Sequence, residues 1–224
     1  MRRSSIRASV RPSLIAMLAA FLVASAVLAA PSSPSAAPSR LDALLARLDK
    51  SAQSVQTLAG QFTQKSRLKL FKQELASRGR FFFRRPRQVR WEYTEPDAST
   101  LVLDAEKATL KTPGAPPQTF DLGRDATLRA VFDQLFLWLG AGSLEKARAD
   151  YELVAGGTDA APTLTLTPRP TSPVAKAFAR IELRFDERAL LHAILLREPN
   201  GDDKEIVFDK LTRDGKLPAD AFSP

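Results

Sequence analysis

Side chains that could perform catalysis are scarce in this chain of 224 residues. His192 is its one histidine, and nucleophilic catalysis of the serine type needs a base beside the nucleophile. That histidine lies in the apolar run 190–195, which has the alternation of a strand, and the sequence has no G-x-S-x-G motif. A strand histidine with a solvated or hydrogen-bonded ring explains it better than a catalytic base. We therefore expect no enzymatic activity.

Metal and cofactor motifs are missing from the sequence as well. One histidine and no cysteine cannot form a zinc site. Asp202 and Asp203 follow Asn200-Gly201, and a hairpin turn accounts for them better than calcium ligation does. No phosphate-binding glycine loop or dinucleotide fingerprint is present. We expect neither a metal nor a cofactor.

The most informative stretch is Arg84–Tyr93, which follows Gly79–Phe83. Aromatic and β-branched residues alternate with arginines on both sides of Pro86, which fits only a strand edge or a turn. This pattern predicts two β-strands around a tight connection, each with an apolar and a cationic face. The apolar face meets either the protein's own core or a lipid.

Periodicity places the elements around this stretch. Ser39 and Asp42 form a capping-box pattern before a helix that extends to Val55, and a second helix is predicted over 128–139. Shorter helices are expected from Ser143 through Tyr151 and near 173–179. Alternation with period two predicts strands that begin near residues 60, 75, 89, 101, 108 and 120 and, after the second helix, cover 151–154, 164–167, 181–185, 191–196 and 205–211. Together these elements indicate one domain with a long, bent antiparallel sheet and helices on its concave side.

The beginning of the chain has the features of an export signal. Positive charge precedes an apolar run over 14–28, and small residues fit a cut after Ala29. We expect a cleavable signal peptide over 1–29, a flexible Pro/Ser/Ala tether over 30–39 and the domain over 40–224. An uncleaved anchor is the less favoured alternative. A periplasmic location follows.

Charge and cysteine content agree with this location. The formal net charge is +8, and the four arginines of the signal leave +4 for the mature part, which is weak evidence for nucleic-acid binding. The absence of cysteine means that packing alone stabilises the fold. We expect a soluble monomer with no nucleic-acid partner.

Aromatic side chains concentrate on the predicted inner face of the sheet and on the second helix. A plain core would explain them, but few helices are available to cover so many strands, and a curled sheet encloses space. Each buried methylene contributes about 0.8 kcal/mol, so a chain of about fifteen carbons would contribute roughly 12 kcal/mol before costs. An apolar cavity would therefore suit acyl chains.

These residues resemble, in order along the chain, the periplasmic outer-membrane lipoprotein carrier family of the LolA type. The ordered set covers about 60–224, and its members are Phe62-Thr63-Gln64-Lys65, Gly79 with Phe81 and Phe83, Arg85-Pro86, Trp91-Glu92-Tyr93, Pro96, Leu101-Val102-Leu103-Asp104, Leu164-Thr165-Leu166-Thr167-Pro168, Asn200-Gly201-Asp202, and Phe222 with Pro224. Asp104-Ala105-Glu106 replaces the usual Asp-Gly turn, and Leu110-Lys111-Thr112 lacks the tyrosine that commonly follows. The chain is thus similar to a divergent member.

The resemblance implies a mainly β fold with α-helices, an incomplete antiparallel β-barrel of about eleven strands with a helical lid over a hydrophobic cavity. It implies a carrier that receives an acylated lipoprotein or related lipid client from an inner-membrane ABC transporter and passes it to an outer-membrane acceptor lipoprotein. Alternatives are a same-fold binding module for a glycolipid or polyene-type lipid, and an envelope-stress lipoprotein sensor.

The resemblance also assigns roles to residues. Arg85 occupies the position of the arginine that holds the lid in the family, whereas Arg84, Arg87 and Arg90 are expected to be solvated charges on the outer face. The expected lining of the hydrophobic cavity comes from both the sheet and the second helix. Its residues are Phe62, Phe81, Phe83, Val89, Trp91, Tyr93, Leu101, Leu103, Phe132, Phe136 and Trp138.

Overall fold

The computed structural model describes residues 39–69, 73–104 and 106–223. The predicted signal peptide over 1–29 and the tether up to residue 38 lie outside this part. The elements, in chain order, are α1 (Arg40–Gln53), β1 (Thr57–Leu68), β2 (Gln73–Arg84), β3 (Gln88–Glu95), β4 (Ser99–Leu103), β5 (Lys107–Lys111), β6 (Gln118–Asp121), α2 (Ala126–Trp138), the 3₁₀ helix η1 (Lys146–Ala149), β7 (Tyr151–Gly157), β8 (Pro162–Pro168), the 3₁₀ helix η2 (Pro173–Lys176), β9 (Arg180–Phe185), β10 (Leu191–Arg197) and β11 (Asp203–Arg213).

The strands form one antiparallel sheet of eleven strands in the order β6-β5-β4-β3-β2-β1-β11-β10-β9-β8-β7. β1 lies at its centre and pairs with β2 on one side and β11 on the other, so the first and last strands of the domain meet. β6 and β7 do not pair, and the sheet stays open between them. The predicted fold class, an incomplete antiparallel barrel with a helical lid, is confirmed.

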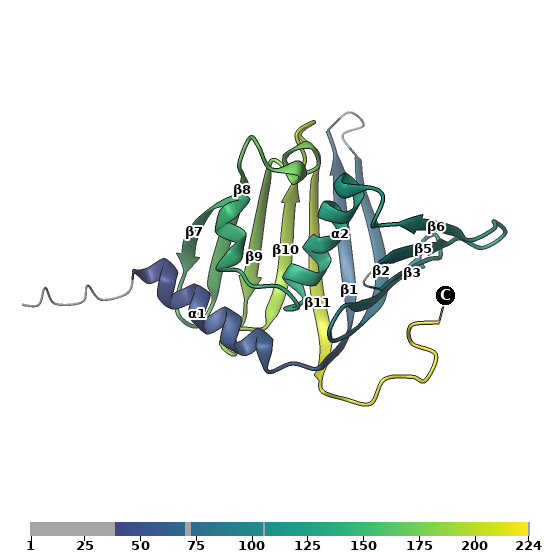
Figure 1. Ribbon diagram of the computed structural model, residues 1–224, viewed down its shortest axis with the longest axis horizontal. Helices are drawn as coiled ribbons and strands as arrows, with labels where there is room; N and C mark the ends of the chain where they lie inside the picture. The colour runs from purple at the N-terminus through teal and green to yellow at the C-terminus, as the bar shows by residue number, and fades with distance from the viewer. Residues whose placement is uncertain (1–38, 70–72, 105, 224) are drawn as a thin grey trace, which may run out of the picture. The chain divides into compact units, whose positions relative to one another are not determined.

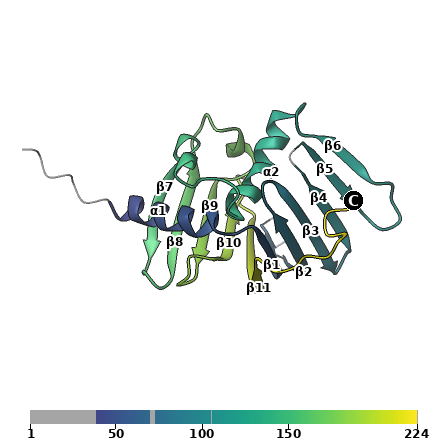
Figure 2. The ribbon, with the colours of Figure 1, turned by 60° about the horizontal axis from the view of Figure 1, so that its bottom comes forward.

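Both α-helices lie on the same face of the sheet, α1 over the β7–β10 half and α2 near its centre (Figures 1 and 2). α1 begins with the predicted capping box, in which the Ser39 side chain accepts from the backbone of Asp42 and the Asp42 side chain accepts from the backbone of Ser39. Arg47 attaches α1 to the β7–β10 half, because its guanidinium donates to the carbonyls of Asp159 and Glu187 at 2.9 and 2.6 Å.

The segment between α2 and β7 differs from its prediction. A short helix from Ser143 through Tyr151 was expected, but the helical part is η1, and Tyr151 is already the first residue of β7. The carboxylate of Asp49 on α1 accepts from the Ser143 hydroxyl at 2.7 Å and from the Leu144 backbone at 2.8 Å. A contact from a distant helix therefore shapes this turn.

One of the turns predicted from the sequence is present in the structure. Asn200-Gly201 forms the connection between β10 and β11, as predicted, with Gly201 at a positive φ. His192 is exposed on β10. Within the described residues, no group of histidine, cysteine, aspartate and glutamate side chains is arranged to hold a metal ion. None of the helices in that same part of the chain is long and apolar enough to cross a membrane.

Candidate functional site

The residues predicted to line a cavity belong to a single apolar cluster between the sheet and the helices. Eight of them are buried, and Tyr93, Leu101 and Phe132 are partly buried and pack against the others. The buried members are Phe62, Phe81, Phe83, Val89, Trp91, Leu103, Phe136 and Trp138. Strand alternation brings the sheet residues together, because every second side chain of β1, β2 and β3 points to the same face.

Stacked aromatic rings form the centre of this cluster. The Phe62 and Trp91 rings lie 4.3 Å apart between centroids, and Phe81 stacks on Trp91 at 5.8 Å. Phe208 of β11 meets Phe81 edge-on at 5.3 Å. Phe208 was not singled out from the sequence, although its place in the alternation of β11 opposite Phe62 was a usable signal.

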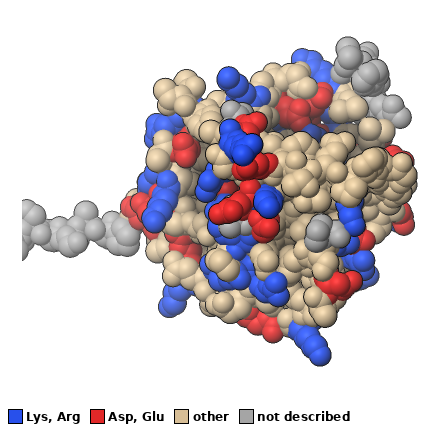
Figure 3. Space-filling view, turned by 45° about the vertical axis from the view of Figure 1, so that its right-hand side comes forward, with Lys and Arg blue, Asp and Glu red and all other residues tan. Residues whose placement is uncertain are grey.

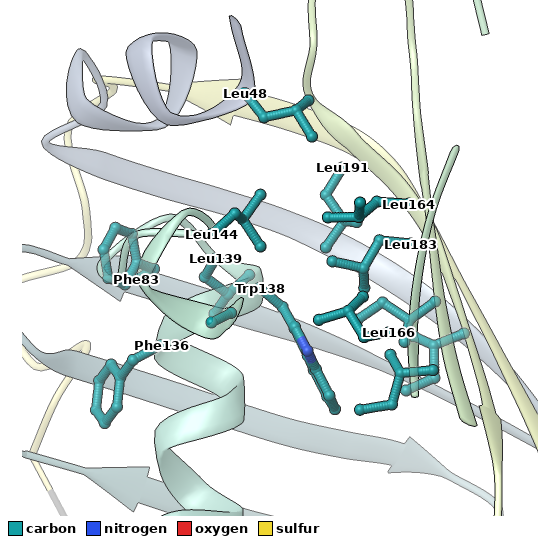
Figure 4. Close-up of a cluster of buried hydrophobic side chains, with 14 of the residues drawn as sticks. Leu48, Phe83, Phe136, Trp138, Leu139, Leu144, Leu164, Leu166, Leu183 and Leu191 are labelled. Carbon is teal, nitrogen blue, oxygen red and sulfur yellow. The ribbon is translucent and has the colours of Figure 1, made fainter. Parts of the chain in front are cut away.

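The second helix contributes aromatic side chains in two directions (Figure 4). Trp138 points from the end of α2 toward Leu166 and Leu183 of the β8–β9 region, whereas Phe136 lies on the side of α2 that carries it toward Phe83. Both side chains are buried. α2 therefore covers two parts of the inner face at once, and its displacement would expose both.

The interior is filled in this conformation where the two helices meet the sheet. The pocket between α1, the end of α2 and the β9–β10 strands has a volume of only about 40 Å³, and Leu48, Trp138 and Leu191 are among its lining residues. Sites for small organic ligands have volumes of about 300–1,000 Å³. An acyl chain could occupy this space only after α2 or its neighbours had moved away from the sheet.

Arg85, in the turn between β2 and β3, contacts the ends of both helices. Its Nε donates to the carbonyl of Val55 at 2.6 Å, and its Nη2 donates to the carbonyls of Ala52 at 2.7 Å and Gly140 at 2.5 Å. The last carbonyls of a helix have no partner within the helix and carry the negative end of its dipole. Of the three acceptors, Ala52 belongs to the last turn of α1, whereas Val55 and Gly140 directly follow the ends of α1 and α2. A planar guanidinium with several donors bonds to all three carbonyls together.

The α1–α2 contact beside Arg85 depends on the absence of a side chain at Gly140. A Cβ added there would lie 2.9 Å from the Cβ of Ala52, and the residue has a φ of +87°. Both features favour glycine, which alone adopts this conformation without strain. The close approach places the carbonyls of Ala52 and Gly140 within reach of a single guanidinium.

Arg87 is a second connection between this turn and α2, and the expectation that it is a solvated outer-face charge is wrong. Its guanidinium forms an ion pair with Asp133 and lies 4.3 Å from the centroid of the Phe136 ring. Both partners are on α2, a distant segment of the sequence that the local pattern could not connect to Arg87. The turn thus holds α2 by two arginines.

The neighbouring arginines have other partners. Arg84 lies over the ring of Phe222 at 4.6 Å, and Arg90 donates to the carbonyl of Ser223 at 3.0 Å and pairs with Glu92. The contacts with Phe222 and Ser223 hold the C-terminal segment against the sheet, and neither arginine contacts α1 or α2 through them. Arg84 is exposed, as expected, whereas the Arg90 side chain is only 22% exposed.

A buried hydrogen bond joins α2 to β7. The Tyr151 hydroxyl donates to Oε1 of Gln134 at 2.6 Å, and Nε2 of Gln134 donates to the carbonyl of Ala130 at 3.0 Å. Burial, with the nearby charge of Asp150, raises the pKa of the Tyr151 hydroxyl far above its ordinary value, so this group remains a protonated donor.

The side of the molecule shown in Figure 3 carries charges of both signs. Arginines and lysines alternate with acidic residues around an area without charged side chains. Ion pairs such as Arg80–Glu92 at 3.0 Å and Arg197–Asp203 at 2.8 Å link neighbouring strands. The face in Figure 3 therefore presents charges of both signs rather than one continuous basic area.

Comparison with known proteins gives one family. The family model described as "Outer membrane lipoprotein carrier protein LolA" matches residues 53–224. No curated protein sequence matches the chain. Solved structures with a similar fold include the lipoprotein LppX of Mycobacterium tuberculosis, at 11% identity over 80% of this chain and 98% of that one, with a TM-score of 0.45.

Two further solved structures are similar at the same level. The LolA superfamily protein of Nitrosomonas europaea is 10% identical over 82% of this chain and 97% of its own, with a TM-score of 0.42. The MucA/MucB complex of Pseudomonas aeruginosa gives 16% identity over 81% of this chain and a TM-score of 0.44, and this chain spans 60% of the matched one.

Proposed function

Since the chain belongs to the LolA family of outer membrane lipoprotein carrier proteins, we propose that it is a periplasmic carrier for acylated cargo. The acyl chains of a lipoprotein or related lipid enter the space between the sheet and the helices. An inner-membrane ABC transporter supplies this cargo, and an acceptor lipoprotein on the outer membrane receives it. The carrier has no catalytic activity of its own and acts as a monomer.

The observation that carries this proposal is the position of Arg85 over the aromatic interior. Three hydrogen bonds from one side chain join the β2–β3 turn to the ends of α1 and α2. Phe83, two residues before Arg85 on β2, and Phe136 on α2 are buried in the apolar cluster. Hydrogen bonds that join the helices to the sheet beside an apolar interior can break when cargo enters and form again when it leaves.

Opening and loading are thermodynamically coupled. In the closed state the aromatic side chains pack against one another. The pocket at the helix junction is then too small for an acyl chain. Cargo that binds only the open state shifts the population toward that state, and its apparent affinity is reduced by the fraction of molecules that are closed. Arg85 sets that fraction, and because closing of the lid displaces the bound cargo, it also controls how readily the cargo leaves.

α1 and α2 are held by different parts of the molecule. Arg47 and Ser51 of α1 donate to carbonyls of the β7–β8 and β9–β10 connections, at 2.9, 2.6 and 3.2 Å. The arginines of the β2–β3 turn and Tyr151 hold α2 through side-chain contacts. We propose that α2 is the part of the lid that moves, while α1 remains on its half of the sheet.

Mass spectrometry of the protein purified from its native periplasm tests the proposal. Co-purifying acylated polypeptide supports a lipoprotein carrier, and free glycolipid or polyene-type lipid supports transport of another lipid class. A protein that is consistently empty, and that binds no acylated peptide when one is added, would contradict the proposal. Hydrolysis of an acyl ester that is lost on mutation of one serine would replace it with an enzymatic function.

A further inference from the structure

The inner face of the central strands gains polar side chains toward one end, where their neighbours include the apolar Ile206, opposite Gln64, and Leu75, opposite Ser66. At the end near the β2–β3 turn it carries Phe83 and Val89, which are completely buried. At the other end, the inward positions of the same strands hold Gln64 and Ser66 on β1 and Tyr93 on β3. An acyl chain has the same asymmetry, because its hydrocarbon ends in a polar linkage to the rest of the molecule.

The three polar side chains form one hydrogen-bonded row. The Tyr93 hydroxyl donates to Oε1 of Gln64 at 2.8 Å, and Nε2 of Gln64 donates to Oγ of Ser66 at 3.1 Å. Burial raises the pKa of the Tyr93 hydroxyl above its ordinary value, so this group keeps its proton and remains a donor. The donors in the row therefore follow one another from Tyr93 on β3 to Gln64 on β1 and then along β1 to Ser66.

The row crosses β2 at a glycine. β2 lies between β1 and β3, and Gly79 is the residue opposite both Phe62 and Tyr93. A Cβ at Gly79 would lie 2.4 Å from Cζ of Phe62, so no larger residue fits beneath that ring. The Phe62 ring in turn meets the Tyr93 ring edge-on at 5.2 Å. The polar row is thus held against the edge of the aromatic stack by packing.

The row ends in a donor that has no partner. Ser66 is 7% exposed, and its hydroxyl accepts from Gln64. In the part of the chain that the structure describes, that hydroxyl donates no hydrogen bond to the protein, and the Gln64 amide donates only the one to Ser66. Ser66 is buried and Gln64 is partly buried, and a buried donor that is left without an acceptor is costly, so a ligand acceptor would be favoured beside Ser66.

From this arrangement we propose that Gln64 and Ser66, positioned by Tyr93, form a subsite that donates hydrogen bonds to the carbonyl oxygen of an acyl ester or acyl amide. The subsite lies directly beyond Phe62, so a chain packed on the aromatic stack would place its linkage there. This inference rests on the proposed carrier function and adds to it the part of the cargo that is recognised.

The chemistry of the row favours an uncharged acceptor. Its members are a phenol, a carboxamide and a hydroxyl, all neutral donors, and the adjacent inward position of β2 is Ser77, opposite Gln64. The charged residues of these strands, such as Lys65 and Arg78, occupy the alternate, outward positions. A phosphate or carboxylate headgroup would find no positive charge in the row, whereas an ester or amide carbonyl finds two donors.

A matched pair of lipids tests the subsite. Diacylglycerol with ester linkages and the dialkyl ether analogue with the same chain length differ only in the carbonyl groups, and competition with a fluorescent fatty-acid probe gives the affinity of each. We expect the full-length protein to bind the ester form about three- to tenfold more tightly, the usual effect of a neutral hydrogen bond. A Gln64→Leu/Ser66→Ala double variant should lose this preference and keep its affinity for the ether.

The controls separate this inference from the proposed function. Tyr93→Phe should reduce the preference for the ester while the Phe62 contact and the affinity for the ether remain. Ser77→Ala, at the neighbouring inward position, should leave both affinities unchanged. If the wild-type protein binds ester and ether equally, or the double variant keeps the preference, the subsite is refuted but the carrier function stands. Failure of the wild-type protein to bind either lipid refutes the carrier function.

Discussion

Replacing Arg85 with leucine should make cargo bind more tightly and leave more slowly. The substitution removes all three hydrogen bonds from the guanidinium to the carbonyls of Val55, Ala52 and Gly140. It preserves an apolar side chain of moderate size beside the buried cluster. The substitution therefore destabilises the closed state, in which these hydrogen bonds are formed. The open, loaded state keeps its stability, because the bonds are not formed there.

The size of the effect follows from the bonds that are lost. A hydrogen bond from a charged donor contributes about 1.5–3 kcal/mol, and three bonds from one side chain are not additive. Arg85 is also only partly buried. We therefore expect the closed state to lose about 2–4 kcal/mol relative to the open one, which shifts the closing equilibrium by about 30-fold or more. The apparent affinity rises by up to that factor, until the open state predominates.

Two measurements test this result. Stopped-flow dilution of protein loaded with a fluorescent acyl peptide gives the release rate, which should fall. Urea denaturation gives the free energy of unfolding of the empty protein, which should fall by about the same 2–4 kcal/mol. Arg84→Leu is the matched control, since its guanidinium lies over Phe222 and leaves the helices untouched.

The reasoning fails if Arg85→Leu releases cargo at the same rate as Arg84→Leu and the wild-type protein. It also fails if the variant binds cargo more weakly while its unfolding free energy is unchanged. In that case Arg85 would contact the cargo itself, and the closed arrangement would not be the state that competes with loading.

Three further predictions concern the core, the helix junction and the C-terminal end of β11. Gly140→Ala should lower the free energy of unfolding by about 1–2 kcal/mol and speed cargo loading, because a Cβ there strains a positive φ and meets Ala52; urea denaturation and loading kinetics measure both. Phe62→Ala should cost about 3–5 kcal/mol of unfolding free energy in urea, since it removes a buried ring stacked on Trp91. Two backbone N–H groups at the start of β1 lower the pKa of Asp214, so its contribution to stability is present above pH about 4 and lost as the pH falls further. Asp214→Asn should be less stable than the wild-type protein at pH 7, and this difference should shrink on acidification in a series of thermal melts.

Much of the fold could be predicted from local patterns. The capping box at Ser39 and the spacing of leucines fixed the first helix to within a few residues, and the second helix was placed correctly over α2. Alternation predicted the strands, and Asn200-Gly201 predicted the β10–β11 turn. These features depend on residues two to four positions apart, so the sequence displays them directly.

Part of the candidate site was also accessible from the sequence. Alternation along β1, β2 and β3 identified the side chains that share the inner face, and the cluster contains every residue that was expected there. The role of Arg85 as a latch stays a proposal, and its bonds to Val55 and Gly140 cross 30 and 55 positions of the chain. No local pattern could have given those partners.

The family resemblance pointed to Arg85, but only the tertiary structure decided which element each of the other arginines meets. Four arginines lie within seven residues of the sequence, at positions 84, 85, 87 and 90. Two of them contact the helices, and the other two contact the C-terminal segment. Their partners come from segments brought near by the pairing of β1 with β11 and by the passage of α2 over the sheet. The sequence by itself determined the elements and their apolar faces, because these follow from short-range periodicity. The packing of the helices against the sheet depends on strand register and helix placement, and only the folded chain defines these.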